Sequence, residues 1–371
     1  MRICRVSQTY PTNENNGKGL HCYHVSKLNK VPTVIFTKNY KDETYWPEPE
    51  NVILHKIRYW QHPFPKDNSF SVDWLMSVFS YFFGQIQFLI GSVPALIKFQ
   101  PTITHIQSPH AIFIGLFNKL FFKTPILLTF HGSDLLRIKN IKPYHFLLRK
   151  VDAILYVNPD MLEDLERIFP NVQKINSPSG VDLSFFNNLP KKRKRQLVAV
   201  GNLRWQKAYE DLLQSFYIFL KEYPDYKLII AGDGDLKQDL IKQSELLGIS
   251  NSVIFLGRVS SQKIKSILLE SELFVMSSVT EGMPKALLEA LASHLPVVVT
   301  DVGACKKLST DVGLCVECRN PPAFARAIDK VLNDKDKYQQ YVQNCRKKIE
   351  GNSWSNLASI ILETMKKLEE N

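Results

Sequence analysis

Residues 273–303 read LFVMSSVTEGMPKALLEALASHLPVVVTDVG. Two short apolar runs in this stretch, Leu273–Met276 and Pro296–Thr300, predict buried strands, and residues 284–293 between them have the apolar spacing of a helix. A strand, a crossover helix and a second strand are typical of a parallel sheet. The stretch therefore predicts an α/β fold.

The same alternation of short apolar runs and helical segments extends over most of the chain. We expect further strands at Ile3–Val6, Thr33–Phe36, Val52–Ile57, Ile103–Ile106, Ile126–Phe130, Ile154–Val157, Leu197–Val200, Leu228–Ala231 and Val253–Leu256. We expect further helices at 19–30, 73–99, 110–122, 159–168, 207–223, 235–247, 261–271 and 335–369. The pattern predicts doubly wound parallel sheets with helices on both faces.

The length of the chain predicts two domains, at roughly 100–200 residues each. Five consecutive cations follow Pro190 near the middle of the chain and favour a solvated linker; an anion-binding patch or a nuclear signal is the alternative. We predict an N-terminal domain over residues 1–187 and a C-terminal domain over 188–353. Two such Rossmann-like domains would face each other across a cleft, where a ligand is expected.

The charge of the chain is strongly positive, with 47 Lys and Arg against 36 Asp and Glu, a formal net charge of +11. No motif of a nucleic-acid-binding domain accompanies it, so we expect other partners. Residues 51–150 hold 11 cations and three acids, a local charge of +8. The 24 uncharged residues between Asp73 and Lys98 include Gln, Ser, Gly and Pro, which argue against a membrane span. They favour a buried helix or a helix at an anionic membrane surface.

The six cysteines are sparse, and Cys315 and Cys318 form a lone CxxC without a second pair or neighbouring histidines. We therefore expect free thiols in a reducing compartment rather than a zinc site. The first seven residues lack the apolar core of a signal peptide. These features predict a cytoplasmic protein, with the inner face of the membrane as the place of any surface contact.

The turn at Glu281 is the first candidate site. The helix that follows would direct free backbone N–H groups out of the carboxyl edge of the sheet, where they attract phosphate. Glu281 and Glu289 would repel a phosphate but accept hydrogen bonds from hydroxyl groups. The segment thus predicts a ligand that carries both phosphate and sugar hydroxyls. A helix-start charge at Glu281 and an exposed Glu289 are the structural alternative.

The loop after the strand Leu197–Val200 is the second candidate. Gly201 ends the strand, and Arg204 and Lys207 precede the next helix. Two cations at this edge would neutralise a diphosphate and support its departure, unless they are simply solvated. Gly232, within Ala-Gly-Asp-Gly, repeats the small-residue loop after the next strand.

Two loops of the first domain complete the set. His131 and Gly132 follow the strand Ile126–Phe130, where an imidazole could hydrogen-bond a sugar hydroxyl; a purely structural histidine is the alternative. Asp134 is a candidate cap for the next helix. Residues 17–19, Gly-Lys-Gly, would let the backbone approach a ligand, without the spacing of a dinucleotide or Walker motif.

Together these segments resemble the retaining glycosyltransferases of family 4, which have the GT-B fold. The most specific element is the Glu-x7-Glu pair, Glu281 and Glu289, within EGMPKALLEALA. Residues 179–182, Ser-Gly-Val-Asp, resemble the family's N-G-V-D turn, and Trp354-Ser355 resembles the start of its last helix. The resemblance implies that this last helix, at about 354–371, packs back on the first domain. The resemblance runs over nearly the whole chain.

The resemblance implies a role for each candidate residue. Four side chains would be catalytic: His131 at the donor sugar, Glu281 holding that sugar, and Lys207 and Arg204 at the diphosphate. The donor would also be bound by the loops and the helix start, at Gly19, Gly201, Asn202, Gly232, Arg258, Val259, Gly282, Met283, Pro284, Lys285 and Glu289.

The chain departs from the family pattern G-R-L-x-x-x-K-G, because Asn202 takes the arginine position and Ala208 the glycine position. Relatives with Asn there have an arginine two residues later, which is Arg204 in this chain. Residue 18 separates two glycines that are usually adjacent, and His294 replaces a frequent glycine. None of these changes removes a carboxylate or His131.

The implied activity is transfer of a sugar from a nucleotide diphosphate-sugar to an acceptor hydroxyl, with retention at the anomeric carbon and without a metal or other cofactor. The acceptor would be a glycan or a lipid-linked glycan, in polysaccharide or glycolipid synthesis. The alternatives are another GT-B chemistry, a nucleotide-sugar epimerase or a phosphorylase, and a degenerate protein that only binds a nucleotide sugar.

Overall fold

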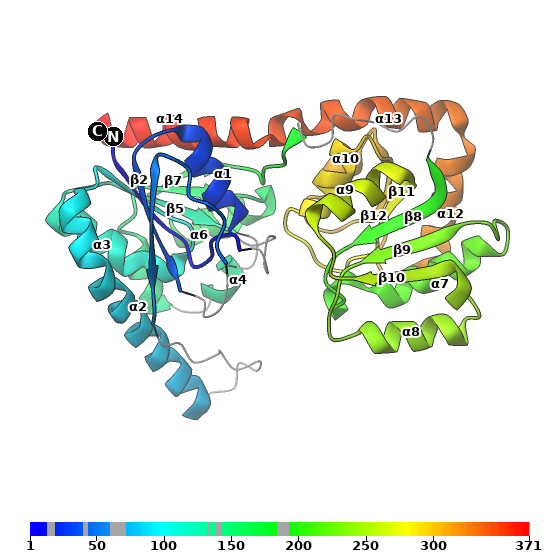
Figure 1. Cartoon of the computed structure of the whole chain (residues 1–371), viewed down its shortest axis with the longest axis horizontal. Coiled ribbons are helices and arrows are strands. Elements are labelled where there is room, and N and C mark those ends of the chain that lie inside the picture. Colours follow the sequence, from blue (N-terminus) through cyan, green and yellow to red (C-terminus); the bar gives the residue numbers. More distant parts are fainter. Residues whose placement is uncertain are drawn as a thin grey trace. The chain divides into compact units, whose positions relative to one another are not determined.

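The computed structural model of the protein describes residues 1–12, 19–39, 44–59, 72–131, 134–138, 142–183 and 193–370. The chain forms two compact units: unit 1 contains Met1–Pro178 and Trp354–Asn371, and unit 2 contains Ser179–Ser353 (Figure 1). The chain therefore passes between the units twice, and the first passage comes before the boundary that we predict at residue 187.

The described part of unit 1 contains a parallel sheet in the order β3-β2-β1-β4-β5-β6-β7. Its strands are β1 (Ile3–Val6), β2 (Thr33–Lys38), β3 (Val52–Ile57), β4 (Ile103–Ile106), β5 (Ile126–Phe130), β6 (Ala153–Tyr156) and β7 (Gln173–Asn176). The strand order reverses between β1 and β4, where Ile3 pairs with Thr33 on one side and with Ile103 on the other. This reversal is the switch point of a doubly wound sheet.

Helices cover both faces of this sheet (Figure 1). One face packs on α1 (Leu20–Asn29) and α14 (Trp354–Glu370). The other packs on α2 (Val72–Phe99), α3 (Ile112–Phe121), α4 (Asp134–Ile138), α5 (Lys142–Leu148) and α6 (Leu162–Ile168). Alternate residues of β1 point to opposite faces, so that Ile3 lies under α14 and Cys4 on the α3 side.

Unit 2 repeats the architecture, with strands in the order β10-β9-β8-β11-β12-β13 among the residues described. They are β8 (Lys194–Val200), β9 (Lys227–Ala231), β10 (Val253–Gly257), β11 (Ser271–Met276), β12 (Val297–Thr300) and β13 (Gly313–Val316). One face packs on α7 (Tyr209–Leu220), α8 (Lys237–Leu246) and α12 (Pro321–Asn333); the other packs on α9 (Ser261–Glu270), α10 (Lys285–Ala292) and α11 (Cys305–Ser309). Helix α13 (Lys335–Ile349) contributes to both cores.

The C-terminal helical stretch that we predict over 335–369 is interrupted, and its second part matches the last helix expected at about 354–371. It consists of α13, a short turn of 3₁₀ helix at Glu350–Asn352, and α14. The segment between the two helices pairs with the start of unit 2. Ser353 forms a β-bridge with Val181, and the Val181 N–H donates to the Asn352 carbonyl at 2.7 Å. The chain thus leaves unit 2 beside the segment by which it entered.

Where the structure describes the cation run, at residues 193–195, it is not a linker, although Lys194 and Arg195 are exposed to solvent; residues 190–192 lie outside the described part. Lys194 and Arg195 already belong to β8. The guanidinium of Arg193 donates to backbone carbonyls at the C-terminal ends of α9 and α10, those of Leu268, Leu269, Ser271, Ser293 and His294. Helix ends leave such carbonyls without intrahelical donors, and their partial negative charge attracts a cation. The role of Arg193 was not predicted, because a run of like charges does not indicate which of its members binds helix ends.

Helix α2 is apolar on two opposite faces. Phe88 and Leu96 are buried in the core on the inner side. The outer side exposes an apolar stripe at helical spacing, formed by Met76, Phe79, Phe83, Ile86, Ile90 and Ile97. Residues 82–99 are long and apolar enough to cross a membrane by length and composition alone. The helix is therefore buried on one side only, and contact of its outer side with a membrane stays a prediction.

Candidate active site

The predicted residues of unit 2 follow neighbouring strands and lie at one edge of its sheet. Gly201 follows β8, Gly232 follows β9, Arg258 follows β10 and Glu281 lies in the turn after β11. Because the strands are parallel, their carboxyl ends meet at the same edge (Figure 1). The topology thus brings together loops that are far apart in the sequence.

Glycines allow three of these loops to touch. The Gly232 N–H donates to the Gly257 carbonyl at 2.9 Å, and the Gly201 N–H donates to the Ala231 carbonyl at 3.0 Å. A Cβ on Gly232 would lie 1.8 Å from the Gly201 carbonyl oxygen. Only glycine fits this close approach. The weak Gly-Asp-Gly signal therefore marks a backbone contact between loops.

Lys207 and Glu281, the two strongest candidates, form an ion pair. The Lys207 Nζ lies 2.5 Å from Glu281 Oε1, and the Ser278 hydroxyl donates to the same oxygen at 2.7 Å. Both side chains are largely buried, with exposed fractions of 26% and 10%. The Glu281 carboxylate is therefore fixed in place and holds the amine predicted to meet a diphosphate.

Backbone contacts hold the loop of Lys207 against the strand end of β11. The Ser277 hydroxyl donates to the carbonyls of Lys207 and Ala208, at 3.0 and 2.9 Å, and the Val279 N–H donates to the Gln206 carbonyl at 2.8 Å. Ala208 has a φ of 44° and a ψ of 48°, in the left-handed region. That region favours glycine, which is a physical reason for glycine to be common in relatives at this position.

Helix α10 begins one residue later than predicted. Pro284 is the N-cap, in an extended conformation with φ −73° and ψ 112°, and no side chain caps the helix. The first helical residue, Lys285, pairs with Glu289 one turn on, at 3.3 Å between Nζ and Oε1. Glu289 is 19% exposed, so the alternative of a fully exposed residue is not supported. The uncapped first turn keeps N–H groups for an anion.

Gly303, in the loop after β12, presses on the Glu281 turn. Its φ is 49°, and a Cβ there would lie 2.3 Å from the Glu281 carbonyl oxygen. The Ala304 N–H donates to the Gly282 carbonyl at 3.1 Å. The position of Glu281 thus depends on a loop 22 residues further along the chain, for which the sequence predicted no role.

The other residues predicted to bind the donor are more exposed to solvent. Asn202, Arg204 and Arg258 are exposed, and Val259 and Met283 are half-buried. The Asn202 carbonyl accepts from the Arg204 N–H at 2.9 Å, which tightens the loop. Arg204 makes no ion pair with the residues that the structure describes.

Cys315 and Cys318 are free thiols, and the Cys318 thiol lies 3.7 Å from the Ser278 carbonyl oxygen. Burial raises the pKa of both. No group of three or more His, Cys, Asp or Glu is arranged for a metal ion within the described ranges.

In unit 1, His131 stands at the end of β5, and Gly132 lies outside the described residues. The His131 N–H donates to the Asp134 carboxylate at 3.1 Å, and the Asp134 N–H donates back to the His131 carbonyl at 2.9 Å. Asp134 therefore caps the turn before α4. Burial lowers the pKa of His131 to about 4, so that its imidazole is neutral near pH 7.

Gly19 is the N-cap of α1, with a φ of 71°; its neighbours Gly17 and Lys18 lie outside the described residues. A Cβ on Gly19 would lie 2.6 Å from the Thr9 carbonyl oxygen. The glycine therefore allows the start of α1 to approach the loop after β1.

A buried polar cluster lies next to His131 and was not predicted. The ring of His21 packs edge-on against that of His131, with centroids 5.2 Å apart, and against His105 at 6.4 Å. Arg5 is fully buried, and its Nε donates to His105 Nδ1 at 3.3 Å. Burial, reinforced by the nearby Arg5 charge, lowers the pKa of His21 and His105. In the sequence, Arg5 within the apolar run Ile3–Val6 is the feature that could have indicated a buried polar cluster.

Two family models match consecutive parts of the chain. The model for glycosyl transferases group 1 matches residues 181–348, and the model for glycosyltransferase family 4 matches residues 32–185.

Individual relatives agree with the two models. An uncharacterised glycosyltransferase of Methanocaldococcus jannaschii is 33% identical over 167 residues, 44% of this chain and 43% of the relative. The alpha-monoglucosyldiacylglycerol synthase of Streptococcus pneumoniae is 25% identical over 229 residues, 54% of this chain and 52% of that enzyme. The chain spans about half the length of the curated relatives that it matches.

Among solved structures, HepE of Anabaena in complex with UDP has a TM-score of 0.77 at 14% identity, over 99% of this chain and 100% of that one. This likeness concerns the fold. Since the two family models follow one another along the chain and meet near the start of unit 2, the protein belongs to the group 1 glycosyltransferases of the family 4 type, with their GT-B fold.

Proposed function

We propose that the protein transfers a sugar from a nucleotide diphosphate-sugar to an acceptor hydroxyl, with retention of configuration. The observation that carries the proposal is the Lys207–Glu281 pair at the carboxyl edge of unit 2, next to the uncapped start of α10. A cation, a fixed carboxylate and free N–H groups match the phosphates and the hydroxyls of such a donor. HepE, which shares the fold, is a protein crystallised with UDP.

In the mechanism that we propose, the acceptor oxygen attacks the anomeric carbon from the face that the diphosphate leaves. The bond from that carbon to the phosphate oxygen breaks, and the acceptor proton passes to the departing phosphate. Lys207, Arg204 and the α10 N-terminus stabilise the negative charge that develops, in place of a metal ion. Glu281 holds sugar hydroxyls, and neutral His131 hydrogen-bonds another.

The first test is a panel of nucleotide sugars in a thermal unfolding assay. A bound donor raises the melting temperature by mass action. At a donor concentration of a hundred times its Kd, the free energy of unfolding rises by about 2.7 kcal/mol. We expect one nucleotide sugar to stabilise the protein. If none does at millimolar concentration, the donor site as proposed is wrong.

The second test is Glu281→Gln. The amide keeps the shape and can still accept from Ser278, but it loses the charge that holds Lys207. We expect transfer to fall roughly a hundredfold or more, with unchanged folding by circular dichroism. Glu245→Gln, on the exposed side of α8, is the matched control. Near-normal turnover in Glu281→Gln would contradict the role of this carboxylate.

Product analysis separates the alternatives. An epimerase would convert the donor without an acceptor, a phosphorylase would need free phosphate, and a degenerate protein would bind the donor without turnover. Asn202 and Ala208 are the features that favour the last of these.

We also propose that the acceptor is lipid-linked and that the outer face of α2 meets an anionic membrane at the cytoplasmic side. A soluble helix normally exposes polar residues opposite its core face. Here Phe79 and Ile90 are each 65% exposed, and the rings of Phe79 and Phe83 stack with centroids 6.2 Å apart. The local charge of +8 over residues 51–150 suits anionic lipid.

Vesicle flotation tests this surface. We expect binding to phosphatidylglycerol vesicles that weakens with salt, and little binding to phosphatidylcholine. Replacing Phe79 and Ile90 together with Asp should abolish it, whereas Leu246→Asp, at an exposed apolar position of α8, should not. No binding to anionic vesicles at low salt would refute the proposal.

A further inference from the structure

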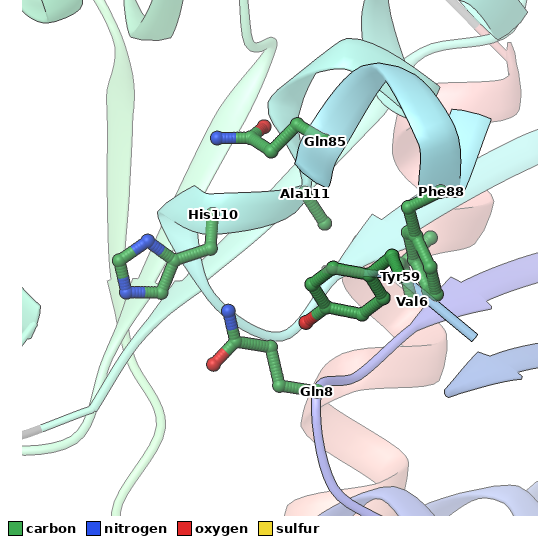
Figure 2. A pocket seen from close by; sticks show the side chains of 7 residues that line it. All are labelled: Val6, Gln8, Tyr59, Gln85, Phe88, His110 and Ala111. Carbon is green, nitrogen blue, oxygen red and sulfur yellow. The ribbon is translucent and has the colours of Figure 1, made fainter. Parts of the chain in front are cut away.

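A narrow crevice in unit 1 is lined by residues at or after the ends of β1, β3 and β4 and by one side of α2: Val6, Gln8, Tyr59, Gln85, Phe88, His110 and Ala111 (Figure 2). None of these seven residues is an acid, a lysine or an arginine. A diphosphate is bound by cations and free N–H groups, so this crevice does not suit the donor. The oriented charge that suits the donor lies in unit 2, at Glu281.

The two oxygens of the Glu281 carboxylate have different surroundings. Oε1 accepts from the Lys207 amine at 2.5 Å and from the Ser278 hydroxyl at 2.7 Å. No hydrogen bond to Oε2 comes from the part of the chain that the structure describes, and the Glu281 side chain is 10% exposed. A carboxylate oxygen accepts about two hydrogen bonds, so Oε1 has no further capacity. Oε2 is therefore the oxygen that is left for a sugar hydroxyl.

Lys207 and Ser278 constrain the carboxylate in different ways. A lysine amine is a point charge with three donors on a flexible stem, so it can follow the carboxylate as it turns. The last torsion of a glutamate side chain has a broad range, and such an ion pair alone does not set it. The Ser278 hydroxyl gives a directional hydrogen bond from the strand end of β11. Ser278 therefore decides which way the carboxylate faces.

Ser278 is itself held by residues of the next two strands. Its carbonyl accepts from the hydroxyl of Thr300, the last residue of β12, at 2.5 Å. The thiol of Cys318, which follows β13, lies 3.7 Å from the same carbonyl oxygen. Ser278 is fully buried and Thr300 is 2% exposed. Since neither side chain can touch a substrate, Ser278 can influence the reaction only through Glu281.

We infer that Ser278 is a positioning residue for the sugar transfer, and that its hydroxyl turns the Glu281 carboxylate so that Oε2 alone faces the donor sugar. Oε2 then accepts from one or two hydroxyls of that sugar, in hydrogen bonds to a charged acceptor. The diphosphate is bound by other groups, so Ser278 affects the sugar and not the phosphates. The inference deepens the proposed function and rests on it.

Titration calorimetry with two ligands tests this role. The first ligand is whichever of UDP-glucose, UDP-galactose, UDP-N-acetylglucosamine and GDP-mannose binds the wild type most tightly, and the second is the free nucleoside diphosphate of that donor. In Ser278→Ala we expect the Kd of the nucleotide sugar to rise about tenfold, because the sugar loses an oriented acceptor. The Kd of the nucleoside diphosphate should change by less than about twofold, since this ligand has no sugar for Oε2 to meet.

Ser244→Ala is the matched control. Ser244, on α8, is 2% exposed, and its hydroxyl donates to the Ile241 carbonyl at 2.6 Å. This variant also loses a buried hydroxyl of unit 2, and it should leave both Kd values unchanged. Thr300→Val keeps the shape of the side chain and removes the hydroxyl that holds Ser278. It should raise the Kd of the nucleotide sugar selectively, but by less than Ser278→Ala does.

A double variant shows whether Ser278 acts through Glu281. Glu281→Ala has no carboxylate to turn, so the further change Ser278→Ala should alter the Kd of the nucleotide sugar by less than about twofold. Circular dichroism and thermal unfolding check that each variant is folded.

Three results would overturn the inference: an equal rise of both Kd values in Ser278→Ala, an unchanged Kd of the nucleotide sugar in that variant, or additive losses in the double variant. In each case the proposed function stands, because the wild type binds the nucleotide sugar. If no nucleotide sugar of the panel binds the wild type at millimolar concentration, the proposed function fails, and the role of Ser278 fails with it.

Discussion

Gly303 shows how a single residue controls the geometry of the candidate site. Gly303→Ala would place a methyl group 2.3 Å from the Glu281 carbonyl oxygen at a φ of 49°. The left-handed conformation alone costs an alanine about 1–2 kcal/mol, and the clash must move the Glu281 turn as well. We expect the free energy of unfolding to fall by more than that range. The Kd of the nucleotide sugar, measured through its effect on thermal unfolding, should rise at least tenfold.

Gly248→Ala is the control for that variant. Gly248 has a φ of 72°, and no atom lies within 4 Å of the position of a new Cβ. Gly248→Ala should lose only the free energy of unfolding that the left-handed backbone conformation costs an alanine, and it should bind the donor with an unchanged Kd. Equal effects of the two substitutions on donor binding would show that Gly303 does not position the turn.

The Lys207–Glu281 pair is the second feature at the scale of residues. If the two side chains act as one unit, their effects are not additive. We expect Lys207→Met and Glu281→Gln each to raise the Kd of the donor. The Kd of the double variant should lie within about twofold of that of the weaker-binding single variant. A double-mutant cycle in the thermal assay measures this, and additive losses would contradict it.

At the scale of elements, α14 completes the core of unit 1 from the far end of the chain. Trp354 stacks on His24 with ring centroids 4.8 Å apart, and Ile361 is fully buried with Ile3, Ile103 and Leu127. Ile361→Ala should lower the free energy of unfolding by about 2–5 kcal/mol, because it leaves a cavity under the sheet.

The neighbouring isoleucine gives the comparison for α14. Ile360 is only half-buried, so Ile360→Ala should cost clearly less than Ile361→Ala in the same urea titration. Similar costs would mean that α14 does not pack as described.

Sequence patterns predicted elements well where burial was continuous. The inner strands β1, β4 and β5 have every residue buried and match the predicted bounds. The strands β7 and β13 were not predicted, because they have few buried residues and only one neighbour in the sheet. Helix α12 was also missed, although its buried residues Phe324, Ala325, Ile328 and Val331 follow helical spacing.

At the scale of the molecule, the clustered histidines His21, His105 and His131 predict a dependence of stability on pH. The pKa of His131 is lowered to about 4, and that of His21 and His105 is lowered too, so the fold holds all three neutral. Their unfolded pKa is about 6.5. Between that value and the folded pKa the unfolded chain binds more protons, so stability falls as the pH is lowered from 6.5 towards 4.

Urea unfolding at pH 7, 6 and 5 measures this dependence. Each histidine contributes up to about 1.4 kcal/mol per pH unit below 6.5. His131→Gln should reduce the slope by the contribution of one proton. An unchanged slope in this variant would show that His131 is not held neutral by the fold.

The sequence by itself determined the α/β class, most of the strands and the family, because a buried parallel strand needs a continuous apolar run and the Glu281–Glu289 segment has a specific spacing. Only the tertiary structure decided which side chains meet. The Lys207–Glu281 pair, the contact of Gly303 with the turn and the hydrogen bonds of Arg193 to distant carbonyls all join residues far apart in the chain. Local periodicity indicates which face of an element is buried. Which loops meet at the edge of a sheet depends on the order of the strands and on the paths of the loops, and no local sequence pattern contains that information.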